Sequence, residues 1–157
     1  MAKAEASGAG KEMRLQEALR DTLRYEMARD QRVFVMGEDV ALFGGAYGVT
    51  RGLFQEFGAE RVLDTPISEA ALVGLAVGAA INGMRPVVEI QFSDLLPLAM
   101  DQLASHAARY HYMTGGRISV VSRSTARLIP PQIPGASSRP GISILNSPRR
   151  IICVACQ

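Results

Sequence analysis

The sequence Asp64-Thr65-Pro66-Ile67-Ser68-Glu69 marks the passage from a buried strand to a helix, and it decides the fold. The two apolar residues before it are typical of a strand. Pro66 ends that strand, because proline lacks an N–H group and favours an extended residue before it. Ser68 is expected to cap a helix that begins at Glu69. Residues 70–81 carry no charge, so Glu69 is an acid at the start of an apolar helix. Glu69 has one of two roles. It only stabilises the start of the helix, or it belongs to a functional site.

Strand and helix patterns alternate on both sides of this stretch. Strands are predicted over residues 32–36, 61–64, 85–91 and 118–121, and helices over 13–29, 50–57, 69–81 and 93–113. This alternation is typical of an α/β doubly wound fold with a mainly parallel sheet. Ligands of such sheets bind beyond the carboxyl ends of the strands. Glu38, Glu69 and Gln91 end or follow strands, so we expect them to converge at one edge of the sheet.

Two glycines lie one turn apart in the central helix, at Gly74 and Gly78. Each costs about 1 kcal/mol of helix propensity relative to alanine, so a neighbouring element must need the space. That neighbour is either an element of the same chain or a helix of a partner subunit, and the sequence leaves both open.

Other polar residues suggest less specific roles. Glu89 lies inside a β-type run and is expected to meet an arginine across the sheet. His106 and His111 have helical spacing and are expected at the helix surface or at an interface. Cys153 and Cys156 form one C-x-x-C pair, a weak signal for zinc or redox chemistry without further cysteines or histidines.

The composition fits one globular domain or part of a larger one. The chain has 157 residues, of which 48% are hydrophobic and 20% charged, enough to form a core. No apolar run reaches the roughly 20 residues that span a bilayer, so no membrane segment is expected. Residues 1–12 are small and polar and lack the apolar core of a signal peptide, which predicts a disordered lead-in.

The last 36 residues, 122–157, differ from the rest of the chain. They contain five arginines, five of the eight prolines and no acidic residue. The arginines are scattered with no aromatic residue between them, so a nucleic-acid partner is not expected. The prolines exclude long elements. We expect an irregular tail that is poorly ordered or ordered only by a partner, with short strands possible at residues 141–145 and 151–155.

Four runs resemble a known family in their order and spacing. They are Gly37-Glu38-Asp39-Val40-Ala41, residues 64–69, residues 83–92 and residues 101–116. They resemble the β subunit of the thiamine-diphosphate-dependent 2-oxo acid dehydrogenases, the E1 component of pyruvate, branched-chain and acetoin dehydrogenase complexes. The resemblance covers about residues 13–121 and implies a transketolase-like pyrimidine-binding domain.

The resemblance also implies a role for several side chains. In the family, the glutamate that matches Glu69 hydrogen-bonds the N1′ atom of the aminopyrimidine, which implies a catalytic role for Glu69. Protonation of N1′ makes the 4′-amino group more acidic, so that its imino form can take the proton from C2 of the thiazolium ring. Residues that match Ile67 and Gln91 line the same ring, and Glu38 matches a family acid near the site. Leu95 occupies the position at which an aromatic residue usually packs on the pyrimidine.

The chain departs from the family pattern in three respects. Leu95 replaces the aromatic residue, so we expect weaker stacking or stacking by Phe92. The family continues after the Gly-Gly strand with a histidine-bearing loop and a carboxyl-terminal domain, whereas no histidine follows His111 here. We therefore expect a shortened chain, through a premature ending or a frame change. The Gly-Asp-Gly diphosphate motif is absent, because the family carries it, with the Mg²⁺ ligands, on the α subunit.

The function implied by the resemblance is that of an E1 β subunit. Such a subunit decarboxylates a 2-oxo acid through thiamine diphosphate and passes the acyl group to a lipoyl carrier. Its implied partners are an α subunit, a second β subunit in an α2β2 assembly and a lipoyl-bearing E2, in the cytoplasm.

Two alternatives stay open. One is an inactive shortened form that keeps only the fold and the assembly surface. The other, a nucleotide-binding regulatory domain, is disfavoured because no glycine-rich strand–turn–helix signature is present. The sequence does not distinguish which 2-oxo acid, or acetoin, is the substrate.

Overall fold

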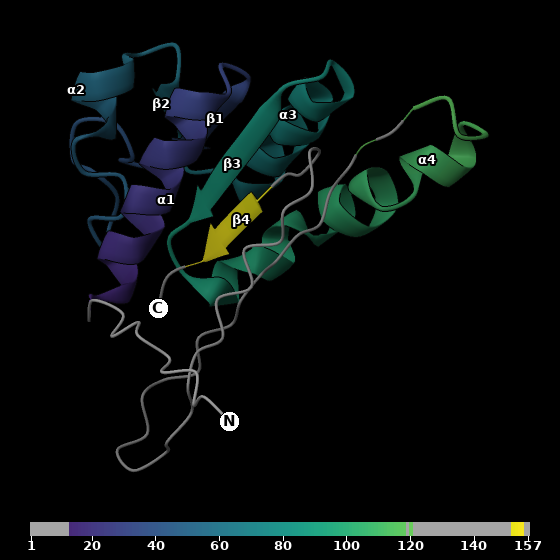
Figure 1. The fold of residues 1–157 in the computed structure, drawn as a ribbon. Coiled ribbons are helices and arrows are strands. Elements are labelled where there is room, and N and C mark those ends of the chain that lie inside the picture. Colours follow the sequence, from purple (N-terminus) through teal and green to yellow (C-terminus); the bar gives the residue numbers. More distant parts are fainter. Residues whose placement is uncertain (1–12, 119, 121–151, 156–157) are drawn as a thin grey trace, which may run out of the picture.

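The fold is a parallel sheet with helices on both faces (Figure 1). The computed structural model describes residues 13–118, 120 and 152–155. Its elements are α1 (Leu15–Arg29), β1 (Val33–Gly37), α2 (Leu53–Phe57), β2 (Val62–Asp64), α3 (Glu69–Ile81), β3 (Arg85–Ile90), η1 (Ser93–Ala99), η2 (Asp101–Ala107), α4 (Tyr110–Met113) and β4 (Ile152–Ala155). The strand order is β2-β1-β3-β4, and every pairing is parallel. The predicted doubly wound fold with a mainly parallel sheet is confirmed.

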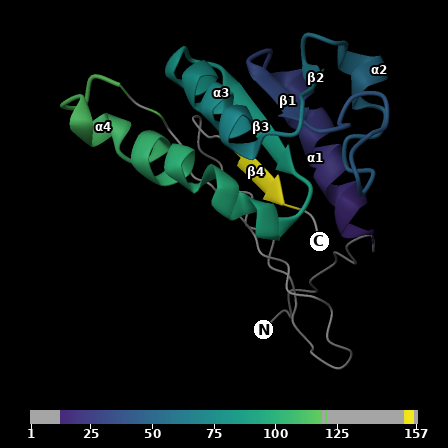
Figure 2. The same ribbon diagram turned by 180° about the vertical axis from the view of Figure 1, so that it is seen from behind.

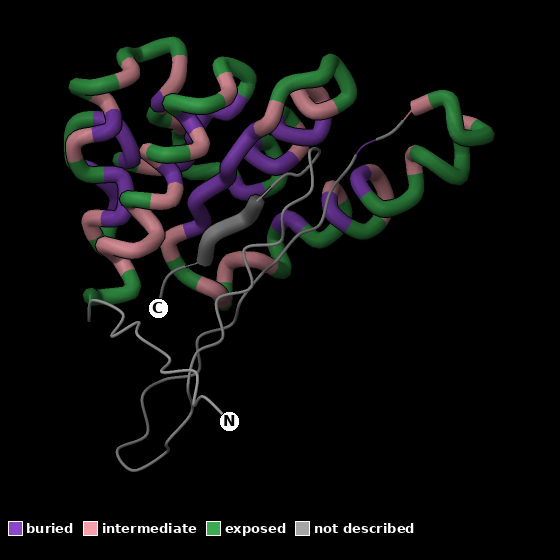
Figure 3. Tube along the Cα trace, viewed as in Figure 1, coloured by how far each residue is buried: buried purple, intermediate pink, exposed green. Residues whose placement is uncertain are grey.

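Side chains that alternate along the strands form two cores, one on each face of the sheet. The α1-side core contains buried residues of β1, β2 and β3 with α1, α2 and the loop between β1 and α2. The α3-side core contains the intervening residues of β1 and β3 with α3, η1 and η2. Figure 2 shows α3 and the η1–α4 segment covering their face, and Figure 3 shows buried residues along β1 and β3 between the layers. Both faces of the sheet are therefore covered, as parallel strands require.

The single long helix predicted over residues 93–113 is wrong. The chain follows a helical path there, but as a 3₁₀ helix (η1), a π-helix (η2) and one short α-helical turn (α4). Pro97 lies inside η1, and its carbonyl accepts an i→i+3 bond from the amide of Met100. The amide of Ala108 donates instead to the carbonyl of Leu103, five residues back, at 3.0 Å. Proline removes one α-helical donor, and the backbone bonds change spacing after it.

The strand predicted over residues 118–121 is not formed by the residues that can be described there. Ile118 and Val120 lie outside any strand, and residues 119 and 121 lie outside the described residues. The fourth strand comes from the tail instead, because Ile152–Ala155 pairs with β3, as the possible strand at 151–155 suggested. The possible strand at 141–145, the lead-in 1–12 and most of the tail lie outside the described residues.

At the amino end of the sheet, the charged side chains of Arg61 and Asp30 make hydrogen bonds and ion pairs. The guanidinium of Arg61 donates to the carbonyl oxygens of Val33 at 2.7 Å and of Met27 and Asp30, each at 3.0 Å. The Asp30 carboxylate accepts from Arg32 and pairs with Arg85. The hydrogen bonds from Arg32 are the main reason why the pKa of Asp30 is lowered to about 2. Arg61 therefore binds backbone carbonyl oxygens at this edge, and Asp30 has Arg32 and Arg85 as partners of opposite charge.

The start of α3 differs from the sequence prediction in one contact. Ser68 occupies the N-cap position, but its side chain caps no backbone amide, and its backbone lies at φ −171° and ψ 87°. The carbonyl oxygen of Ser68 accepts from Leu72 at 2.9 Å. Glu69 is the first residue of the helix, as predicted.

The two helix glycines have different surroundings. A Cβ atom at Gly74 would lie 3.3 Å from the side-chain oxygen of Gln102 on η2, so this position accommodates an element of the same chain. A Cβ atom at Gly78 would meet nothing within 4 Å. Leu75 on the same helix is 61% exposed. The part of α3 around Gly78 thus presents a small-residue surface that the described residues do not cover.

Candidate functional site

The polar residues predicted to converge follow the carboxyl ends of β1, β2 and β3. Glu38 directly follows β1, Gln91 directly follows β3, and α3 begins five residues after β2. The side-chain amide of Gln91 donates to the backbone carbonyl of Glu38 over 3.4 Å. This bond joins residues 53 positions apart and brings Glu38 and Gln91 to one edge of the sheet.

Glu69 is buried at the first turn of α3, with only 7% of its surface exposed. Within the described residues its carboxyl group accepts no hydrogen bond. The amino end of a helix favours a negative charge at this position. Glu69 is thus a carboxyl group whose acceptor capacity is unused by the described chain.

Glu38 lies close enough to Glu69 for their charges to interact. Partial burial is the main cause that raises the pKa of Glu38, and the negative charges of Glu69 and Asp39 raise it further. Asp39 has a left-handed backbone with φ 54°, a conformation that aspartate tolerates better than most residues. The turn after β1 therefore holds Glu38 near the carboxyl groups of Glu69 and Asp39, and Glu38 forms no ion pair with any other described residue.

The remaining predicted site residues, Ile67 and Leu95, differ in their exposure to solvent. Ile67 is 81% exposed and leaves its aliphatic surface free. Leu95 is half-buried and packs against the α3-side core. Phe92 is 42% exposed, and its ring meets that of Tyr47 edge-on, with centroids 6.2 Å apart. An aromatic surface beside this edge thus comes from Phe92 and Tyr47.

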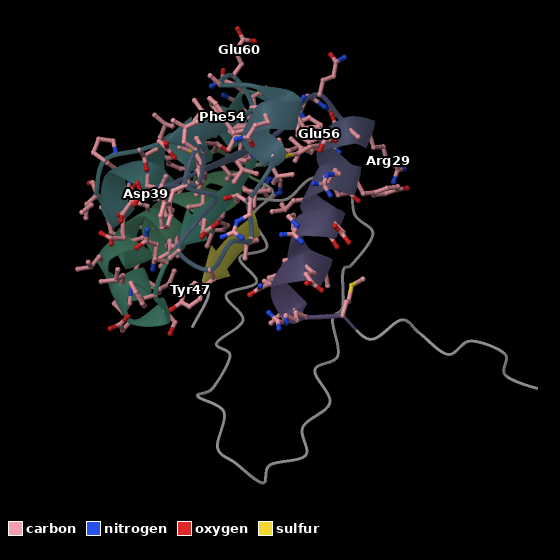
Figure 4. The ribbon with its side chains drawn as sticks, turned by 90° about the vertical axis from the view of Figure 1, so that its left-hand side faces the viewer. Arg29, Asp39, Tyr47, Phe54, Glu56 and Glu60 are labelled. Carbon is pink, nitrogen blue, oxygen red and sulfur yellow. The ribbon has the colours of Figure 1, made fainter. Side chains whose placement is uncertain are left out.

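The loop of residues 38–50, called the 38–50 loop below, closes the site on the α1 side of the sheet. Figure 4 looks at this side and labels Asp39 and Tyr47, which belong to the loop. The Asp64 carboxylate accepts from the amide of Ala41 at 2.7 Å, and the Thr50 hydroxyl donates to the carbonyl of Val40 at 2.7 Å. Asp64 thereby ties the end of β2 to the loop that begins with Glu38.

The sequence analysis missed the bond made by Asp64 and was wrong about Glu89. Asp64 was visible as an acid at a strand end, but its partner depends on the path of a loop 23 residues away. Glu89 meets no arginine within the described residues, because its neighbours across the sheet are Gly37 on β1 and Val154 on β4. The sequence did contain a signal for an unusual position, because Glu89 is the one charged residue between Pro86 and Ile90.

The structure also bears on a possible metal site and on the two histidines. Among the described residues, no three His, Cys, Asp or Glu side chains form a group that could hold a metal ion. His106 is half-buried and stacks edge-on against Tyr110. His111 is exposed, and its ring contacts the carbonyl of Ile118 at 3.2 Å. Both histidines lie along the η2–α4 surface, as predicted.

Within the described part of the chain, no helix is both long and apolar enough to cross a membrane.

Comparisons with known proteins match the same part of the chain. Residues 11–125 match the family described as transketolase, pyrimidine binding domain. The chain is 53% identical over 104 residues to the pyruvate dehydrogenase E1 component subunit beta of Rickettsia bellii, covering 66% of this chain and 32% of that protein. It is 44% identical over 110 residues to the mitochondrial subunit beta of Dictyostelium discoideum, covering 70% and 31%. The chain thus spans about a third of the length of these relatives.

Replacing Asp64 tests whether it holds the 38–50 loop. Asp64→Ala should lower the free energy of unfolding by about 1–2 kcal/mol, because the amide of buried Ala41 loses a charged acceptor. Asp64→Asn keeps an acceptor oxygen and should lose less. Urea denaturation of the full chain measures both variants, with exposed Glu60→Ala as the control. A stability of Asp64→Ala equal to that of the control would contradict this role.

Proposed function

We propose a function on the premise that this chain belongs to the transketolase pyrimidine-binding domain family. The domain supplies the pyrimidine half of a thiamine diphosphate site, as the β subunit of a 2-oxo acid dehydrogenase E1 component. The observation that carries this proposal is Glu69, a residue that is 7% exposed at the first turn of α3 and whose carboxyl group accepts no hydrogen bond from the described residues.

The residues at this edge fit an aminopyrimidine. Glu69 offers a carboxyl group that accepts no hydrogen bond from the described residues, and a protonated ring nitrogen is the kind of donor that would satisfy it. Gln91 adds a polar side chain beside Glu38, while Ile67 and Phe92 offer apolar surface. When bound, thiamine diphosphate supplies the electron sink for decarboxylation. In this proposal Glu69 holds the proton at N1′, Ile67 and Gln91 line the ring, and Glu38 lies nearby.

The proposal includes partners, since the sequence contains no Gly-Asp-Gly diphosphate motif. The diphosphate and its Mg²⁺ are assigned to an α subunit, by the family resemblance. A second β subunit would complete an α2β2 assembly, and a lipoyl-bearing E2 would accept the acyl group. Because the relatives are named pyruvate dehydrogenase, pyruvate is the proposed 2-oxo acid. The cytoplasmic location stays a prediction, since some relatives are named mitochondrial.

A second candidate is an inactive form that keeps the fold and the assembly surface. The absence of any histidine after His111 favours it, because the family places an active-site histidine beyond this point. The wild-type arm of the next experiment separates the candidates, since an inactive form would not accelerate exchange at C2 even with an α subunit.

Glu69→Gln tests the proposed N1′ partner. Glutamine is nearly isosteric with glutamate but cannot take part in proton transfer, so the fold should persist. The variant should slow exchange of the thiazolium C2 proton by about 10²–10⁴-fold. The measurement is NMR-detected exchange in thiamine diphosphate with Mg²⁺, the chain and an E1 α subunit.

Glu60→Gln is the matched control, because Glu60 is exposed and makes no ion pair among the described residues. Its exchange rate should equal that of wild type. Undiminished exchange in Glu69→Gln, with the α subunit still associated, would exclude Glu69 as the N1′ partner.

Gly78→Leu tests whether α3 lies at a subunit interface. Leucine should leave the chain as stable or raise its stability by up to about 1 kcal/mol, since it favours a helix over glycine and the position is open. It should weaken association with an α subunit or a second copy, as measured by light scattering. Ala28→Leu, on an exposed position of α1, is the control. Equal assembly masses for wild type and Gly78→Leu would refute the interface.

A further inference from the structure

Glu89 lies under the 38–50 loop in a row of residues that crosses the sheet. Gly37 on β1 is in register with Asp64 on β2 and with Glu89 on β3. Two residues earlier, Val35 is in register with Val62 and Val87, and these three valines belong to the α1-side core. Because strand side chains alternate between faces, Asp64 and Glu89 point to that same side, where the 38–50 loop lies.

The backbone of the loop closes directly over the Glu89 carboxyl group. A Cβ atom at Gly45 would lie 2.7 Å and 3.0 Å from its two oxygens, so no side chain fits there. Gly45 also has φ +78°, a conformation that favours glycine. Glu89 is consequently 3% exposed, even though it lies one residue from the end of its strand.

The surrounding donors already serve other acceptors. The amide of Gly45 donates to the carbonyl of Asp39 at 2.8 Å. The amide of Ala41 donates to Asp64, and the Thr50 hydroxyl to Val40. The Oε1 atom of Glu89 is buried and has no hydrogen-bond partner in the part of the chain that the structure describes.

The charged groups nearby do not neutralise an ionised Glu89. Asp64 on β2 and the pair Glu38 and Asp39 after β1 carry the same sign of charge. Arg51, whose backbone packs against Gly44, has an exposed side chain and forms no ion pair with Glu89 among the described residues. An ionised carboxylate would therefore be buried without a donor or a cation, an arrangement of high free energy.

We propose that the protonation state of Glu89 controls the position of the 38–50 loop. As the neutral acid, Glu89 lets Gly45 lie against the sheet. When its proton leaves to water, the carboxylate must reach solvent, and the loop moves away from the sheet and takes Glu38 with it. This inference goes beyond the proposed function, and its test needs neither cofactor nor partner.

The chemistry fixes the direction of the effect. Burial raises the pKa of Glu89 from 4.5 to about 7, so the folded chain holds a proton there that the unfolded chain has lost. The contribution to stability is complete below about pH 4.5 and disappears as the pH rises through about 7. The loop should therefore open at mildly alkaline pH.

Amide hydrogen exchange of the full chain tests the proposal between about pH 5.5 and pH 8.5. In wild type, protection factors of the 38–50 loop should fall roughly tenfold or more as the pH rises, while those of α3 stay constant. Glu89→Gln mimics the neutral acid and should keep the loop protected at every pH. Exposed Glu60→Gln should retain the wild-type profile, and so should Glu38→Gln, which separates the two acids whose pKa is raised.

Two results would overturn the proposal. One is loop protection in wild type that does not change with pH. The other is a pH dependence that persists in Glu89→Gln. If Glu89→Gln does not fold, carboxyl ¹³C NMR of the wild-type chain decides the matter. A glutamate that titrates near pH 7 together with the glycine amide shifts of the loop supports the proposal, and titration of every glutamate near pH 4.5 refutes it.

Discussion

A sheet whose strands all run parallel must gather its carboxyl strand ends at one edge, and the candidate site depends on this constraint. At the opposite edge, Arg61 donates to backbone carbonyl oxygens, and Arg32 and Arg85 pair with the Asp30 carboxylate. At the carboxyl edge, Glu38, Glu69 and Glu89 lie buried or half-buried with no cation beside them among the described residues. The fold thus separates charges that stabilise the domain from acids that are free to interact with a ligand or a proton.

Local sequence signals predicted the elements that form this edge. Pro66 and the uncharged residues after Glu69 located β2 and α3, and the β-type runs located β1 and β3. From these, the convergence of Glu38 and Gln91 followed. The sequence could not predict the helix types after Pro97, because they depend on which carbonyl each amide reaches. It also could not predict the bond of Asp64 or the isolation of Glu89, because both depend on the path of the 38–50 loop across the sheet.

The site described here is half of a larger one under the proposed function. The described residues offer carboxyl, amide and apolar groups suited to a pyrimidine, and the sequence contains no Gly-Asp-Gly diphosphate motif. A divided site makes assembly a condition of activity, since the charge interactions that hold a diphosphate contribute much of its binding. The uncovered surface of α3 around Gly78 then has a role in bringing the two halves together.

Calorimetric titration of the purified chain with thiamine diphosphate and Mg²⁺ tests this division most directly. The chain alone should bind no more tightly than about millimolar, which corresponds to about −4 kcal/mol. Adding an E1 α subunit should tighten the binding by orders of magnitude. Micromolar binding by the chain alone would contradict the divided site and would require a phosphate-binding cradle on this chain.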